Sequence, residues 1–210
     1  MAGLKSDGFE MVVQEYIPGG PDQHIYVEGF RDRNGDIKDL FARRRLRMNP
    51  KDFGNSTIMR SIPLNEVKQA ADDLVRLLKE TNYRGIFSAE FKFDHRDALF
   101  KILEVNARPW WYIECPAICG INVTEMAYLD ALDILVPKVD RYSAGKYFMN
   151  FFADLRLWQK EYQAKKAGLT SYWPDWIRAK PTIFRWTDPL PGIMWVIHLI
   201  MKRFEKNKRY

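Results

Sequence analysis

Two acidic residues on neighbouring stretches of this sequence have the type and spacing to act together. Residues 86–105 alternate apolar and polar side chains on either side of a polar turn at 94–97, which predicts a β-hairpin. Because alternate side chains of a strand share one face, Glu90 lies on the polar face of the first strand. Glu104 and Asn106 lie on the polar face of the second strand, and the turn sets Glu90 about opposite Glu104.

Facing carboxylates repel each other, by up to about 1 kcal/mol on a surface and more when buried, so a positive group must offset them. The candidates are Lys92, an arginine from residues 43–47, or a divalent cation. Two carboxylates and an amide oxygen form an all-oxygen set that suits Mg²⁺, which also binds phosphate oxygens. The alternative is a hairpin whose polar face contacts only water.

A run of arginines forms a second candidate cluster. Arg43, Arg45 and Arg47 share one face if this stretch is a strand. A planar guanidinium binds phosphate and carboxylate groups through two parallel hydrogen bonds. The alternatives are a charged strip facing solvent or an RNA-binding strip.

The remaining patterns predict the elements that must position these groups. Spacing of apolar residues and turn signals indicate strands at 10–17, 24–30 and 37–42, an Asn34-Gly35 hairpin turn, an irregular stretch after Pro50 that includes 54–56, and amphipathic helices over 65–81 and from 123 until Pro137. The predicted fold class is α+β, with a largely antiparallel sheet flanked by helices.

Charge is divided unevenly along the chain. The net charge of +6 combines a slightly acidic region, residues 1–140, with residues 141–210, which hold 14 basic and 5 acidic side chains. Five of the seven tryptophans also lie in the second region, which predicts a basic, Trp-rich helical extension packed on the first domain. A slightly acidic main body argues against nucleic acid as a partner.

Cysteine usage and the N-terminus predict a cytoplasmic protein. Cys115 and Cys119 are too few for a disulfide framework and lack the histidines of a zinc site. The first ten residues have no apolar core typical of a secretory signal. The longest apolar run, 193–201, is interrupted by His198 and has about half the roughly 20 residues of a spanning helix.

The hairpin closely resembles the metal-binding hairpin of the ATP-grasp superfamily, the carboxylate–amine and carboxylate–thiol ligases. The matching residues are Glu90-Phe-Lys and the stretch 100–108, which reads Phe-Lys-Ile-Leu-Glu-Val-Asn-Ala-Arg. The resemblance implies that Glu90, Glu104 and Asn106 hold Mg²⁺ or Mn²⁺ against the phosphates of ATP. It also implies that Arg108 faces phosphate or the acyl-phosphate intermediate.

Two further stretches resemble the same family. Residues 12–19 look like its linker strand, which implies adenine contacts from Gln14, Glu15, Tyr16 and Ile17, with His24 near the ribose. The arginine run resembles the basic strand that faces the γ-phosphate and the carboxylate substrate, which assigns Arg45 and Arg47 to catalysis. An ordinary strand is the alternative for 12–19.

The resemblance implies a reaction in which ATP phosphorylates a carboxylate and an amine-type nucleophile attacks the acyl phosphate. Trp110 and Trp111 are candidates for the wall of the acceptor site, or for hydrophobic packing. The resemblance covers about 9–136, the C-terminal part of the ATP-grasp unit, and omits the half that carries the glycine-rich loop and phosphate-contacting lysines.

Three explanations for that omission stay open: a fragment of a complete ligase, a subunit paired with a chain supplying the N-terminal half, or a degenerate module. We expect weak Mg²⁺–ATP binding and no turnover by the chain alone. The alternative function is a non-catalytic binding module whose basic amphipathic C-terminus docks on a membrane surface or a partner protein.

Overall fold

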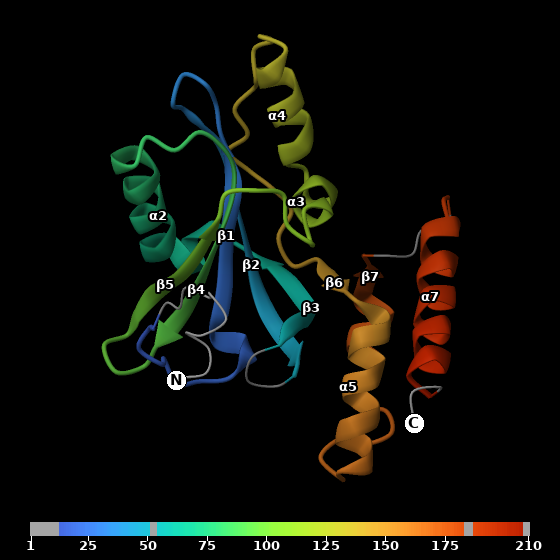
Figure 1. The fold of residues 1–210 in the computed structure, drawn as a ribbon. Coiled ribbons are helices and arrows are strands. Elements are labelled where there is room, and N and C mark those ends of the chain that lie inside the picture. The colour runs from blue at the N-terminus through green and yellow to red at the C-terminus, as the bar shows by residue number, and fades with distance from the viewer. Residues whose placement is uncertain (1–12, 51–53, 183–186, 208–210) are drawn as a thin grey trace, which may run out of the picture.

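The computed structural model describes residues 13–50, 54–182 and 187–207 of the chain. A seven-stranded sheet in the order β5-β4-β1-β2-β3-β6-β7 forms the centre of the fold (Figure 1). Every neighbouring pair is antiparallel except β6 and β7, which run parallel. The strands are β1 (His24–Arg31), β2 (Ile37–Asn49), β3 (Asn55–Ile62), β4 (Gly85–Asp94), β5 (Leu99–Asn106), β6 (Tyr147–Met149) and β7 (Ala179–Pro181).

The predicted α+β class with a largely antiparallel sheet is confirmed. The helix α2 (Lys68–Glu80), preceded by a 3₁₀ turn at Leu64–Val67, packs its apolar residues on one face of the sheet. The alternating Phe87, Ala89 and Phe91 of β4 supply part of that core. The opposite face is covered by α3 (Glu114–Cys119) and α4 (Val123–Ala131) (Figure 1).

The hairpin between β1 and β2 forms at the predicted Asn-Gly turn, where Gly35 has a φ of 88°. β2 is longer than predicted and continues through the arginine run to Asn49. The prediction of an irregular stretch at Asn55 and Ser56 is wrong, because both residues belong to β3 and pair with the end of β2. A short 3₁₀ turn, Pro21–Gln23, leads into β1.

The helices after β5 differ from the predicted pattern. The helix α3 was not predicted, because its six residues are too few to show a helical spacing of apolar side chains. It ends at Gly120, which has a φ of 109°. The predicted second helix starts at Val123 but ends at Ala131, before Pro137. The chain turns at Asp133, whose φ is 61°, and so leaves the helix early.

The C-terminal region is not exclusively helical. It contains α5 (Phe151–Gln163), α6 (Trp173–Arg178) and α7 (Leu190–Asn207), as predicted in type. However, β6 pairs with the outer edge of β3, and β7 pairs with β6, so this region extends the sheet. None of the helices in the described ranges is long and apolar enough to cross a lipid bilayer.

Candidate active site

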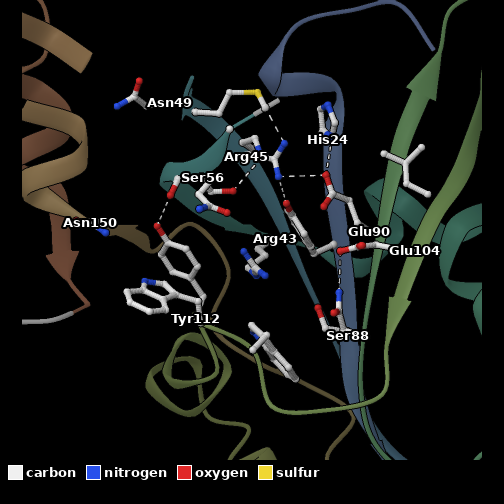
Figure 2. A pocket seen from close by; sticks show the side chains of 18 of the residues that line it. His24, Arg43, Arg45, Asn49, Ser56, Ser88, Glu90, Glu104, Tyr112 and Asn150 are labelled. Carbon is white, nitrogen blue, oxygen red and sulfur yellow. Dashed lines mark hydrogen bonds and ion pairs between the residues drawn. The ribbon is translucent and has the colours of Figure 1, made fainter. Parts of the chain in front are cut away.

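A cavity of about 790 Å³ lies on the sheet face opposite α2. Its wall contains side chains from the strands β1 to β5, from the loop after β5 and from the start of α5 (Figure 2). The polar and charged residues that line it include Gln14, His24, Tyr26, Arg43, Arg45, Asn49, Asn55, Ser56, Ser88, Glu90, Glu104, Asn106, Arg108, Tyr112 and Asn150. A volume of this size is typical of small-molecule sites.

The predicted carboxylate pair is present on the cavity wall. Glu90 of β4 stands directly opposite Glu104 of β5, and Ser88 stands opposite Asn106. The Asn106 amide donates a hydrogen bond of 2.8 Å to Oε1 of Glu104. Strict alternation, however, is broken by a bulge beside this pair, so Leu103, predicted on the opposite face, lines the cavity too.

Glu90 is held between two nitrogen groups. Its Oε1 lies 2.6 Å from Nδ1 of His24 and 3.1 Å from the guanidinium of Arg45. Burial is the largest effect and raises the pKa of Glu90, but the hydrogen bond from His24, the charge of Arg45 and the Tyr26 hydroxyl together lower it. The net shift is downward, so Glu90 is ionised at neutral pH, and Arg45 is a cation directly beside it.

Arg45 is fixed from several sides. Its Nε donates to Ser56 Oγ at 2.8 Å, and one terminal nitrogen also contacts the Tyr26 hydroxyl. The Arg45 side chain is buried. Burial also raises the pKa of Tyr26 to about 12, so the Tyr26 hydroxyl stays neutral. Arg45 therefore presents an oriented positive charge beside Glu90 (Figure 2).

Arg43, two residues earlier, is neutralised within the sheet. Its Nε lies 2.9 Å from both oxygens of Glu28, which also accepts a 2.9 Å hydrogen bond from Ser88. Burial opposes the charge of Arg43, but Glu28 outweighs that effect and the pKa of Arg43 is raised. The guanidinium stacks 4.0 Å from the Tyr26 ring centroid, so Arg43 supports the cavity wall.

The prediction that Arg43, Arg45 and Arg47 share one face is wrong for Arg47. The register between β2 and β3 shifts on both sides of this residue. Its guanidinium instead binds Asp154 of α5 at 3.0 and 2.7 Å and also contacts Asp175 of α6. Arg47 is absent from the cavity wall and joins β2 to the C-terminal region.

The predicted adenine strand is also wrong in the part that is described. Residues 13–17 form no strand, and 10–12 lie outside the described residues. Gln14 lines the cavity and donates to the carbonyl of Leu103 at 3.1 Å. Glu15 pairs with Arg96, an exposed contact of 2.6 Å that turns it away from the cavity.

The other two residues of that segment lie outside the cavity wall as well. The ring of Tyr16 lies 5.1 Å from the Lys92 amine, and Ile17 is buried. His24, predicted near a ribose, lines the cavity but is hydrogen-bonded to Glu90. Of the predicted nucleotide contacts, Gln14 and His24 therefore reach the cavity.

The loop after β5 forms one end of the cavity. Arg108 is exposed there and donates to the carbonyl of Pro109 at 3.2 Å. Trp110 is buried and Trp111 is exposed, and both line the cavity. The Tyr112 hydroxyl donates to the backbone carbonyl of Ser56 at 2.7 Å, which ties this loop to β3 (Figure 2).

Sequence reasoning missed several residues of this wall. Tyr26 lies two residues from His24, so strand alternation could have placed it on the same face. Alternation does place Ser88 on the face of Glu90, but it gave no reason to assign Ser88 to the site. Ser56 and Tyr112 carried no such signal, because β3 was not predicted. Asn150, from the start of α5, comes from a region that was predicted to be peripheral.

The cavity wall fits a hard divalent cation. Glu90 and Glu104 are paired across the strands, and the Asn106 amide nitrogen donates to Glu104, so the Asn106 amide oxygen is the atom that could ligate a cation. Within the part of the chain that the structure describes, there is no group of three or more His, Cys, Asp or Glu side chains suited to a metal. A cation here would complete its oxygen shell with water or phosphate oxygens, as Mg²⁺ does.

Comparison with solved structures finds proteins of similar fold. The fold superimposes with a TM-score of 0.53 on the phosphoribosylaminoimidazole carboxylase ATPase subunit from Aquifex aeolicus, at 16% identity over 66% of this chain and 40% of that one. It superimposes with a TM-score of 0.54 on N5-carboxyaminoimidazole synthetase from Staphylococcus aureus complexed with ADP, at 16% identity over 72% and 40%. These are ATP-grasp enzymes, and the fold of this chain is that of the C-terminal part of the ATP-grasp domain.

Sequence comparison finds a relative among curated proteins. The chain is 26% identical over 109 residues to D-aspartate ligase from Enterococcus faecium (strain Aus0004), which is 51% of this chain and 24% of the ligase. No family model matches the sequence. The chain therefore matches about a quarter of this curated relative and less than half of the solved ATP-grasp enzymes.

Proposed function

We propose that this chain is the metal- and nucleotide-binding C-terminal part of a ligase that uses ATP to activate a carboxylate. The observation that carries the proposal is the facing pair Glu90 and Glu104 on the wall of a cavity, with Arg45 oriented beside it. Acids for a metal and a fixed guanidinium for a transferring phosphoryl group are what phosphoryl transfer requires, because positioning and charge neutralisation dominate its catalysis.

In this proposal Glu90, Glu104 and Asn106 hold Mg²⁺ or Mn²⁺. The bound cation neutralises charge on the phosphates of ATP. His24 and Arg45 keep Glu90 ionised and in place through contacts of 2.6 and 3.1 Å. His24 thus acts as a positioning residue.

Arg45 and Arg108 are proposed to contact the reacting groups. Arg45 sits beside the acidic pair, and Arg108 is exposed at the end of the cavity next to Trp111. A substrate carboxylate oxygen attacks the γ-phosphorus of ATP, the bond to the β-phosphate oxygen breaks, and ADP leaves. An amine then attacks the acyl carbon, loses a proton, and displaces inorganic phosphate.

The proposed substrates are a small-molecule carboxylate and an amine-type acceptor. Similarity to a protein named D-aspartate ligase supports a substrate of this class. We propose that the rest of the ATP-grasp unit comes from a preceding segment or a separate chain, since the solved enzymes are matched over 40% of their length. Gln14 and His24, on the cavity wall, are the proposed nucleotide contacts within this chain.

A substitution in the acidic pair tests the proposal. Glu104→Gln keeps the size of the side chain but removes one anionic ligand. We expect at least a tenfold loss of Mg²⁺-dependent ATP binding, measured by titration of intrinsic tryptophan fluorescence with and without Mg²⁺. Wild-type affinity itself is expected to be weak, with no hydrolysis by the isolated chain.

The matched control is Glu80→Gln, an exposed carboxylate at the end of α2 on the other side of the sheet. It removes the same charge from the molecule, and its binding should equal that of the wild type. Equal loss in both variants would show a nonspecific charge effect. Unchanged binding in Glu104→Gln would refute a metal site at this hairpin.

A further inference from the structure

One face of α7 is apolar and exposed to solvent. Leu190, Ile193, Met194, Ile197 and Met201 are between 42% and 63% exposed. At 3.6 residues per turn these five positions fall within an arc of about 100° around the helix axis. They form a continuous apolar stripe along the helix, which we call the α7 stripe.

The α7 stripe borders an open apolar groove on the molecule. A groove of about 390 Å³ lies between α7 and the start of α5, and all of its lining residues are apolar or glycine. Ile193 and Ile197 belong to both the groove and the stripe, and Gly192 and Val196 line the groove from the inner side of the helix. The exposed apolar surface therefore continues from the helix onto the body of the protein.

The same region carries a large excess of positive charge. Residues 141–210 hold 14 basic and 5 acidic side chains, whereas residues 1–140 are slightly acidic. Lys202, Arg203 and Lys206 occur in the last turns of α7, against Glu205. An apolar helix face followed by basic residues is the composition of helices that lie in the interface of anionic membranes.

The position and charge of α7 argue against two other partners for the α7 stripe, a domain joined to the N-terminus and a second copy of this chain. The segment that begins at residue 13 contacts β5, at one edge of the sheet, whereas α7 follows β7, at the other edge (Figure 1). A domain joined to the N-terminus would therefore approach the far side of the molecule. A second copy of this chain would bring two regions of strong positive charge together.

We propose that the α7 stripe and the adjoining groove dock on the surface of an anionic lipid bilayer, with α7 lying in the plane of the interface. Its apolar side chains enter the acyl boundary, and the basic residues near its end bind lipid phosphates. The proposal does not depend on the reaction at the cavity, which lies over strands β1 to β5 rather than beside β7.

Vesicle flotation tests this proposal with the full chain. Wild-type protein should float with vesicles of phosphatidylcholine and phosphatidylglycerol in a 7:3 ratio at 0.1 M NaCl. It should float much less with pure phosphatidylcholine, or at 0.5 M NaCl, because screening weakens the electrostatic part. On the mixed vesicles, the bound fraction of the triple variant Met194→Gln/Ile197→Gln/Met201→Gln should be at least tenfold smaller than that of the wild type.

The control is the double variant Leu132→Gln/Leu135→Gln, which removes apolar side chains that are 51% and 85% exposed beyond α4. It should float like the wild type, and circular dichroism melts should show that both variants are folded. Absence of wild-type flotation on mixed vesicles, or equal flotation of the triple variant, would overturn the proposal. A dimer that the triple variant dissolves, without lipid binding, would overturn it in favour of self-association.

Discussion

Burial determines how the ionisable side chains of this molecule behave. Glu28 is fully buried and binds Arg43 through both oxygens, so neither charge contacts water. Glu90 is less deeply buried and has two nitrogen partners, and its pKa falls. Asp39 is buried with no cation beside it among the described residues, and burial raises its pKa. At Glu28 burial outweighs the Arg43 cation and the pKa is raised, whereas at Glu90 the two nitrogen partners outweigh burial.

Removing the buried anion tests the first of these cases. Glu28→Gln leaves the Arg43 guanidinium in the core without a counter-charge. We expect the free energy of unfolding to fall by about 3–5 kcal/mol, measured by urea denaturation at pH 7. The exposed pair Lys68 and Asp72 provides the control, because Asp72→Asn should change the free energy of unfolding by less than about 0.5 kcal/mol. Equal losses would contradict the buried-pair argument.

The buried carboxyl of Asp39 should make the stability of the fold fall as the pH rises. One of its oxygens accepts a 3.0 Å hydrogen bond from the Phe30 amide, and the other has no hydrogen-bond partner among the described residues. Burial raises the pKa of Asp39 from 3.8 to about 7, against the smaller effect of that hydrogen bond. The folded state therefore binds a proton that the unfolded state has released, and stability falls as pH rises from about 4 to about 7.

Asp39→Asn removes this proton equilibrium. Relative to the wild type, the variant should gain about 1.4 kcal/mol per pH unit between roughly pH 5 and pH 7, and the difference should then level off. Urea denaturation at pH 5, 6, 7 and 8 measures the gain. Parallel stability curves for the two proteins would show that Asp39 is ionised in the folded state throughout.

At the scale of elements, the C-terminal region is attached to the sheet by a polar junction. Asp154 of α5 is fully buried and accepts hydrogen bonds from Arg47, from Thr57 at 2.6 Å and from Trp176 at 2.8 Å. These donors come from β2, β3 and α6. One carboxylate therefore connects four elements, and it holds α5 where Asn150 lines the cavity.

Asp154→Ala should disturb this junction. The substitution removes two hydrogen bonds of the partly buried Arg47, which keeps its contact with Asp175, and removes the acceptor of Thr57 and Trp176. We expect the free energy of unfolding to fall by about 2–4 kcal/mol, with a change in tryptophan fluorescence, measured in urea. Asp140→Ala, which breaks an exposed pair with Lys138, should stay within about 0.5 kcal/mol. If Asp154→Ala also lowered the free energy of unfolding by no more than about 0.5 kcal/mol, Asp154 would not be holding these elements together.

At the scale of the whole molecule, the boundary near residue 140 was predicted to separate a catalytic domain from an extension. β6 pairs with β3 across this boundary, and α5 contributes to the cavity. The helix α7 lies beyond β7, the last strand of the sheet, and adds no strand to it (Figure 1). We therefore expect folding to depend on residues 141–182 and not on α7.

Two truncations separate these contributions. A chain that ends at residue 140 exposes the edge of β3 and loses Asp154, so it should aggregate or lack a cooperative thermal transition. A chain that ends at Thr182 keeps β6, β7, α5 and α6, and its melting temperature should stay within a few degrees of the wild type. Circular dichroism melts and gel filtration measure both. Identical behaviour of the two chains would contradict the expected dependence.

The sequence by itself determined the features that depend on local periodicity. Alternation placed Glu90 opposite Glu104, the Asn-Gly pair located the first hairpin, and apolar spacing located α2. These predictions needed only the geometry of a strand, a turn or a helix over a few residues. The resemblance of the hairpin to the ATP-grasp superfamily is carried by the same short stretch, and the fold agrees with it.

Only the tertiary structure decided which partners the charged groups acquire. Arg47 binds Asp154, 107 positions away, and His24 binds Glu90, 66 positions away. The bulges in β2 and β5 that redirect Arg47 and Leu103, and the joining of β6 to β3, have no periodic signal. Such contacts form because an unpaired buried charge or sheet edge is costly, and the residue that satisfies it can come from anywhere in the chain.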